Sequence, residues 1–283
     1  MKTLEYLQTQ GAEITLLPVD PYGLINLENL KSSIKKNTIL ISIMLANNEI
    51  GTIQPIEEIG IIAKENKILF HTDAAQAIGH LPIDVYQMNI DLLSFSAHKF
   101  YGPKGIGALV VRSFSPRVEL EPIIYGGGQE RNLRSGTLNV PGIVGLSEAL
   151  QICKKEMKNE NQRLKKLSQK IFNDLKIEFP EIKLNGDPEK RLAHNLKITI
   201  PGIEAKALIH LLKNKLSFST GSACSTVKAE PSYVLKTIGL SDEECFQTIR
   251  IGLGRFVSEN MQISEILINA IKEIIKLYFC ENL

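Results

Sequence analysis

The sequence of 283 residues predicts an α/β fold, in which a mainly parallel sheet covered by helices is followed by a smaller α+β C-terminal domain. Two features predict this class. Short apolar runs alternate with helical patterns through the first half, which is typical of parallel sheets buried on both faces. Near residue 140 the pattern changes to one long amphipathic stretch rich in Lys, Glu and Leu. At roughly 150 residues per domain, the length itself indicates about two domains.

The first half of the chain carries the elements of the predicted sheet. Residues 1–10 resemble the middle or end of a helix that has no cap and no preceding element, so we expect an N-terminal portion of the fold to be missing. The pattern at 55–66 begins with proline, which a first helical turn accepts because its N–H groups have no partner there. The expected strands are 14–19, 38–45, 67–72, 91–96 and 107–112, and the other expected helix is 27–36.

The second half reads as a smaller domain with fewer strands. We place the boundary at residue 150, so that residues 1–150 form part of a large domain and residues 151–283 form the small one. A Ser/Gly-rich loop lies between the second and third of its helices. The expected elements are a helix at 141–179, a strand at 194–200, helices at 204–213 and 231–238, a strand at 248–253 and a helix at 258–278.

Composition and charge exclude several classes of protein. With 33 basic and 31 acidic side chains the formal net charge is +2, which gives no reason to expect a nucleic acid or another polyanion as partner. No stretch approaches the roughly 18 consecutive apolar residues of a membrane span, and the N-terminus lacks the apolar region of a signal peptide. The four cysteines are scattered without CxxC pairs, which argues against a disulfide scaffold or a metal site and favours a reducing, cytoplasmic location.

Polar clusters interrupt the predicted large domain at or near the ends of its strands. In an open α/β sheet, ligands bind beyond the carboxyl ends of the strands, so several clusters at such ends indicate one shared site. Each cluster alone has an ordinary explanation, such as turn chemistry, helix capping or surface exposure. The four clusters are NNEIG at 47–51, HTDAAQ at 71–76, SFSAHK with the following glycines at 94–107, and GGGQERNLRSGT at 126–137.

The combination of side chains in these clusters is more specific than any one of them. Lys99 follows Asp73 by 26 residues, each after a predicted strand, and Ser96 and His98 stand beside the lysine. A lysine near an acid among buried strands can have a lowered pKa and form a Schiff base. An aspartate can keep a pyridine nitrogen protonated, and hydroxyl and imidazole groups can hold a phosphate.

The predicted small domain adds a cysteine and an arginine. Cys224 lies in the small, polar loop at 219–225, where the sulfur is accessible, whereas Cys153, Cys245 and Cys280 read as structural. The guanidinium of Arg250, at 248–253, suits a substrate carboxylate, although a surface ion pair is the ordinary explanation for it.

Taken together, these segments resemble the cysteine desulfurases of the NifS/IscS-like group, which are pyridoxal 5'-phosphate enzymes of fold type I and aminotransferase class V. The resemblance runs from about residue 11 to about residue 274. Seven segments in the family's order carry it: NNEIG (47–51), HTDAAQ (71–76), SFSAHKFYGPKGIGAL (94–109), GGGQERNLRSGT (126–137), GSACS (221–225), EPSYVL (230–235) and IRIGLGRF (249–256).

The resemblance implies a role for each candidate residue. Lys99 would hold the cofactor covalently and move protons, and Cys224 would attack the substrate sulfur and become a persulfide. Thr137 would reach the phosphate of the neighbouring subunit in a homodimer. The remaining implied contacts are Asp73 with the ring nitrogen, Gln76 with the ring oxygen, Ser96 and His98 with the phosphate, Asn48 with the cofactor and the substrate carboxylate, and Arg250 with that carboxylate.

The implied reaction converts L-cysteine to L-alanine and passes sulfur to an acceptor or scaffold protein, for iron–sulfur cluster assembly or thiolation. Two alternatives stay open. The family's phosphate loop and ring-stacking histidine lie upstream of these segments and have no counterpart before Asn47, so the chain could be a non-catalytic or split-gene fragment. Within the same fold, a selenocysteine lyase is the other alternative.

Overall fold

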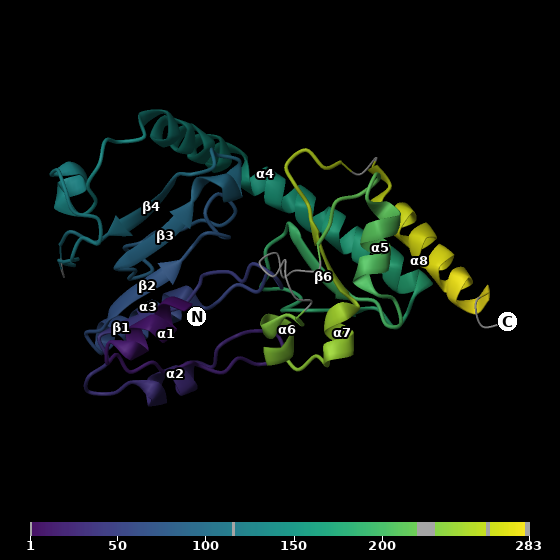
Figure 1. Cartoon of the computed structure of the whole chain (residues 1–283), viewed down its shortest axis with the longest axis horizontal. Helices are drawn as coiled ribbons and strands as arrows, with labels where there is room; N and C mark the ends of the chain where they lie inside the picture. The colour runs from purple at the N-terminus through teal and green to yellow at the C-terminus, as the bar shows by residue number, and fades with distance from the viewer. Residues whose placement is uncertain (1, 115–116, 220–229, 259–260, 281–283) are drawn as a thin grey trace.

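The computed structural model describes residues 2–114, 117–219, 230–258 and 261–280. Its strands form two separate sheets, and one long helix, α4 (Val140–Glu178), runs from the first sheet to the second (Figure 1). Among the described residues, none of the helices has the length and apolar character that crossing a bilayer requires.

The first sheet has four strands in the order β1-β2-β3-β4. Three of them are parallel, and the fourth runs antiparallel to its neighbour, so the predicted mainly parallel sheet is confirmed. The strands are β1 (Leu40–Ser42), β2 (Leu69–Asp73), β3 (Leu92–Ser96) and β4 (Gly107–Val111).

Helices α2 (Leu27–Ser33) and α3 (Ile56–Glu65) accompany this sheet, and α1 (Lys2–Thr9) precedes them. Ile59 of α3 and Phe70 of β2 are fully buried in one cluster, because the apolar stripe of the helix faces the sheet. The cover is incomplete at β4, where Leu109 is 50% and Val110 is 39% exposed. Since consecutive strand residues point to opposite faces, both faces of β4 are open within the described part of the chain.

Three predicted elements differ most from the observed ones. The strand expected at 14–19 is wrong, because the region makes only an isolated bridge from Val19 to Ile25, and Pro18 has no N–H group for a ladder. The strand expected at 38–45 is shorter, and it is buried only at Ile41. The last helix, α8 (Ile263–Cys280), begins five residues later than expected.

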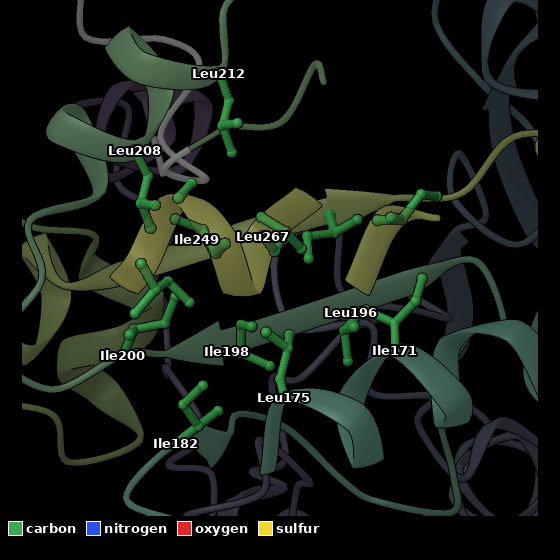
Figure 2. Packing of buried hydrophobic residues seen from close by; sticks show 14 of the residues in the cluster. Ile171, Leu175, Ile182, Leu196, Ile198, Ile200, Leu208, Leu212, Ile249 and Leu267 are labelled. Carbon is green, nitrogen blue, oxygen red and sulfur yellow. The ribbon is translucent and has the colours of Figure 1, made fainter. Parts of the chain in front are cut away.

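The second sheet is antiparallel and carries the larger core. It consists of β5 (Lys183–Leu184), β6 (Asn195–Thr199) and β7 (Thr248–Gly252), of which the sequence predicted the last two. Helices α4 and α8 lie side by side and pack on it with α5 (Ala205–Leu212). Figure 2 shows the result, a cluster of branched apolar side chains from α4, β6, α5, β7 and α8 and from the segments next to them.

Two short helices, α6 (Tyr233–Thr237) and α7 (Asp242–Phe246), complete this half. Val234 and Leu235 of α6 pack with Ile50 from the first half of the chain. Ser232 and Ser241 cap the two helices with their side-chain oxygens, a common use of serine at a helix start. Because α4 spans the position where we placed the domain boundary, the division at residue 150 stays a prediction.

Side chains from both halves of the chain meet beside α4. The rings of His80 and His194 lie with their centroids 4.1 Å apart. The Tyr101 hydroxyl accepts the backbone N–H of Arg255 at 2.7 Å, and the Arg255 side chain binds the carboxylate of Glu160 on α4, also at 2.7 Å. These contacts fix the segment that follows β7 against the segment that follows β3.

The burial of His194 makes the free energy of unfolding depend on pH. Burial, helped by the nearby charges of His80 and Arg250, lowers the pKa of His194 to about 3. The unfolded chain binds this proton near pH 6.5, so the stabilisation is complete above that value and is lost as the pH falls towards 3. Because the unfolded chain takes up this proton and the folded chain does not, His194 alone should lower the free energy of unfolding by about 2 kcal/mol when the pH falls from 7 to 5.

Denaturant unfolding of His194→Gln at both pH values measures this effect. The variant should lose that part of the pH dependence, while His210→Gln, at an exposed position on α5, should keep the parent profile. Equal profiles for the parent chain and His194→Gln would contradict the prediction.

Candidate active site

Two of the predicted site residues end neighbouring strands of the first sheet. Asp73 is the last residue of β2 and Ser96 is the last residue of β3. The register pairs Asp73 with Ser94, so the two strand ends lie at one edge of the sheet. The Asp73 carboxylate is exposed there and accepts the backbone N–H of Ala75 at 2.8 Å. An acid and a hydroxyl therefore share this edge.

Gln76 lies in the turn that follows β2. Its side chain is half-buried, while Ala74 and Ala77 on either side of it are fully buried in the core of the first sheet. The backbone N–H of Ala74 also binds the carbonyl of Ser94 at 2.9 Å, which keeps the turn attached to β3. The turn thus holds Gln76 close to the sheet edge where Asp73 ends.

A single 3₁₀ turn, η1 (Ala97–Phe100), presents His98 and Lys99. Ala97 and Phe100 are fully buried, whereas His98 and Lys99 are exposed directly after β3. The turn ends at Tyr101, whose φ of 70° is in the left-handed region that few residues with a side chain adopt. Buried residues at both ends of this turn therefore orient the amine and the imidazole outward at the strand end.

The second sheet contributes Arg250, which lies in the middle of β7. Its guanidinium donates a hydrogen bond of 2.7 Å to the backbone carbonyl of Asn48, 202 residues away in the sequence. The structure therefore brings together the two residues predicted to hold a substrate carboxylate.

Two predicted residues are not joined to this arrangement. Thr137 is exposed, and among the described residues no hydrogen bond or ion pair connects it to Asp73 or Lys99. Its predicted role involves a neighbouring subunit, so a single chain does not test it. Cys224 lies outside the described residues.

The chain on both sides of 220–229 reaches the same turn of the first half. On the upstream side, Ser219 and Arg250 exchange backbone hydrogen bonds of 3.1 and 2.6 Å. On the downstream side, the Ser232 hydroxyl donates to the Glu49 carboxylate at 2.7 Å. The turn at 47–50 therefore contacts Ser232 directly and is connected to Ser219 through Arg250.

Sequence reasoning missed the buried charges beneath this turn. The Nζ atom of Lys197 lies 3.8 Å from an Oε atom of Glu49, and both side chains are buried. Burial lowers the pKa of Lys197 to about 8, although the carboxylate of Glu49 acts in the opposite direction. The available signal was a lysine inside the otherwise apolar strand 194–200, since a charged residue at such a position requires a partner.

The donor set at the sheet edge fits pyridoxal 5'-phosphate. A primary amine, a carboxylate, a hydroxyl and an imidazole stand exposed or half-buried within two neighbouring strand ends. The amine suits the aldehyde of the cofactor, and the carboxylate suits its protonated ring nitrogen. The hydroxyl and the imidazole both suit its phosphate. The residues that would hold the group are Lys99, Asp73, Gln76, Ser96 and His98.

Known proteins resemble this chain along most of its length. The family model "Aminotransferase class-V" matches residues 2–263. A cysteine desulfurase IscS of Ehrlichia chaffeensis is 48% identical over 276 residues, which is 97% of this chain and 67% of that protein. A probable mitochondrial cysteine desulfurase of Schizosaccharomyces pombe is 51% identical over 92% of this chain and 51% of its own length. The chain thus spans between one half and two thirds of these relatives.

Solved structures of NifS-like proteins have the same fold as this chain. A NifS-like protein superposes with a TM-score of 0.86 at 36% identity, over 98% of this chain and 72% of that one. The NifS-like protein of Rickettsia africae superposes with a TM-score of 0.84 at 30% identity, over 98% and 73%. The sheet edge, the lysine turn and the arginine strand described above therefore lie in a known fold. The chain belongs to the aminotransferase class-V family of pyridoxal-phosphate-dependent enzymes and, within it, to the cysteine desulfurases.

Proposed function

We propose that this chain is a cysteine desulfurase that converts L-cysteine to L-alanine and leaves the sulfur as a persulfide on Cys224. One observation carries the proposal. The turn at 47–50 binds Arg250, whose backbone pairs with Ser219, and it also binds Ser232; it follows β1 of the sheet in which β2 ends at Asp73 and β3 leads to Lys99. The names of the relatives, several of them cysteine desulfurases, support the same reaction.

The residues at the sheet edge would hold the cofactor. When bound, pyridoxal 5'-phosphate supplies an electron sink that weakens the bond between carbon and sulfur. The Lys99 amine binds the cofactor covalently and moves a proton to or from the substrate carbon, and Asp73 keeps the ring nitrogen protonated. Gln76 would donate to the ring oxygen, and Asn48 would also contact the cofactor. Ser96 and His98 bind the phosphate, with Thr137 of a neighbouring subunit.

The residues around the turn would handle the substrate. Arg250 and the side chain of Asn48 bind the carboxylate, since a guanidinium pairs well with two oxygen atoms. The Cys224 thiolate attacks the substrate sulfur, so that a sulfur–sulfur bond forms as the carbon–sulfur bond breaks. The substrate carbon receives the electron pair and a proton, which gives L-alanine and the enzyme persulfide without an external oxidant or reductant.

The wider setting of the reaction is also part of the proposal. We expect a homodimer in the cytoplasm that passes the persulfide sulfur to an acceptor or scaffold protein, for iron–sulfur cluster assembly or thiolation. Neither nucleic acid nor membrane is an expected partner. L-Selenocysteine is the alternative substrate within this fold.

A specific observation favours a second candidate function. The chain spans only 51% and 62% of two of the relatives, and β4 is open on both faces within the described residues. A chain of this kind could be a non-catalytic or split-gene fragment that binds a partner without turning over cysteine. Uptake of the cofactor distinguishes the two candidates.

Lys99→Ala tests the proposal at the cofactor. The purified chain, mixed with pyridoxal 5'-phosphate and reduced with borohydride, should retain about one equivalent of cofactor, because reduction makes a lysine adduct permanent. Lys99→Ala should retain none, while Lys104→Ala, also exposed and five residues away, should retain as much as the parent. Mass spectrometry of the reduced protein measures this. A folded parent chain that retains no cofactor would favour the non-catalytic fragment.

Cys224→Ser tests the nucleophile. The variant should bind the cofactor as the parent does, because the change lies outside the cofactor residues, but cysteine-dependent sulfide release should fall by about 100-fold or more without a thiolate. Ser225→Ala is the neighbouring control and should keep the parent rate. Sulfide release that survives in Cys224→Ser would assign the nucleophile to another group.

A further inference from the structure

Tyr101 ends the turn that carries Lys99, and its backbone conformation is unusual. Its φ of 70° is in the left-handed region, which a large residue keeps only when its surroundings hold it there. The side chain provides such contacts. The Tyr101 hydroxyl accepts the backbone N–H of Arg255 at 2.7 Å and donates to a carboxylate oxygen of Glu160 at 3.4 Å. The residue that ends the lysine turn is therefore attached both to the segment after β7 and to α4.

The Arg255 side chain completes a ring of contacts around this hydroxyl. Its guanidinium lies over the Tyr101 ring, with 4.5 Å between the Cζ atom and the ring centroid, and binds the other carboxylate oxygen of Glu160 at 2.7 Å. The side chains of Arg255 and Glu160 are 14% and 7% exposed, so solvent screens this ion pair little. Arg163 of α4 also donates to the carbonyl of Arg255 at 2.6 Å. Tyr101 thus contacts a partner that is itself fixed.

The backbone of the lysine turn has two further contacts. The Lys99 carbonyl lies 3.3 Å from the ring Nε2 atom of His80, and the Phe100 carbonyl lies 3.6 Å from the sulfur of Cys153 on α4. The Arg255 guanidinium reaches the same sulfur at 3.3 Å. The turn is therefore bound at its backbone as well as at its end, while the Lys99 side chain stays exposed.

The segment that holds Tyr101 also carries the arginine proposed for the substrate. Arg250 lies on β7, and Arg255 follows five residues later. The Arg250 side chain binds the carbonyl of Asn48, whereas the backbone of Arg255 binds the Tyr101 hydroxyl. One short segment of the second half thus relates the residue for the substrate carboxylate to the turn with the cofactor lysine.

We propose that Tyr101, held by Arg255 and Glu160, is a positioning residue that places the Lys99 amine for its reaction with the cofactor aldehyde. In that reaction the amine nitrogen bonds to the aldehyde carbon, and the aldehyde oxygen leaves as water. An amine held in place has a high effective concentration towards the aldehyde, and a looser turn lowers it without changing the contacts of the ring and the phosphate. The inference rests on the proposed function, because it concerns the lysine that would bind the cofactor.

Tyr101→Phe removes the hydroxyl and keeps the ring beneath Arg255. Pyridoxal 5'-phosphate can react with Lys99, whereas pyridoxamine 5'-phosphate has an amine in place of the aldehyde and binds only noncovalently. In Tyr101→Phe the affinity for the aldehyde should fall by about fivefold, while the affinity for the amine should change by less than about twofold, as equilibrium dialysis measures. Tyr86→Phe is the matched control, since Tyr86 is 62% exposed and stacks on Phe114, and it should leave both affinities unchanged.

Arg255→Lys tests the partner of Tyr101. Lysine keeps a positive charge for Glu160 but lacks the planar group that covers the Tyr101 ring and reaches Cys153. The affinity for pyridoxal 5'-phosphate should fall by about threefold in this variant, and by less than the product of the two single effects when it is combined with Tyr101→Phe, because the two residues act through one contact.

Hydrogen exchange measures the attachment without any cofactor. The backbone N–H groups of Tyr101 and Gly102 both bind the carbonyl of Ala97, so their exchange reports the opening of the turn. In the cofactor-free chain, exchange in a peptide that covers these residues should become about fivefold faster in Tyr101→Phe and keep the parent rate in Tyr86→Phe.

The outcomes separate this inference from the proposed function. Equal losses of affinity for the two ligands in Tyr101→Phe, or no loss for either, would overturn the positioning role. Unchanged exchange would overturn the attachment through the hydroxyl, and single effects that multiply fully would overturn the part of Arg255. If the parent chain binds neither ligand, the proposed function fails, and the exchange comparison still decides the attachment. Should Arg255→Lys not fold, Glu160→Gln makes the same test, since it keeps the shape of the partner and removes its charge.

Discussion

The hydrogen bond from the Arg250 guanidinium to the carbonyl of Asn48 joins the two sheets at the point where the site is built. Arg250 belongs to β7 of the second sheet, and Asn48 follows the first strand of the first sheet. A charged donor makes such a bond stronger than one between neutral groups. Together with other contacts between the two halves, such as the Arg191 side chain on the carbonyl of Ile50, it places a residue that would bind the substrate beside the half that would bind the cofactor.

The buried pair of Lys197 and Glu49 contributes more by positioning a carboxylate than by stabilising the fold. Lys197 and Glu49 are both buried, and the pKa of Lys197 is lowered to about 8 by that burial. Removing two charges from water can cost more than their attraction returns, so apolar side chains of similar size would serve the core at least as well. What the pair provides is a carboxylate at a defined position, and Ser232 uses that carboxylate to fix α6.

The lysine turn shows how a short segment can present reactive groups. Buried Ala97 and Phe100 hold η1 against the core, so His98 and Lys99 face outward. Tyr101 then links this turn to Arg255, which follows β7. The position of Lys99 therefore depends on packing and on the second half of the chain as well as on β3.

The sequence by itself determined the local elements and the types of reactive residue. Periodic apolar patterns predicted α4 and the strands around Asp73 and Lys99, because such patterns depend on nearby residues alone. They failed at 14–19, where Pro18 has no N–H group for a ladder and the described residues form only an isolated bridge, from Val19 to Ile25. Only the tertiary structure decided that Glu49 meets Ser232, 183 residues away. Contacts at that separation follow from how two sheets pack around α4, and no local pattern in the chain records that packing.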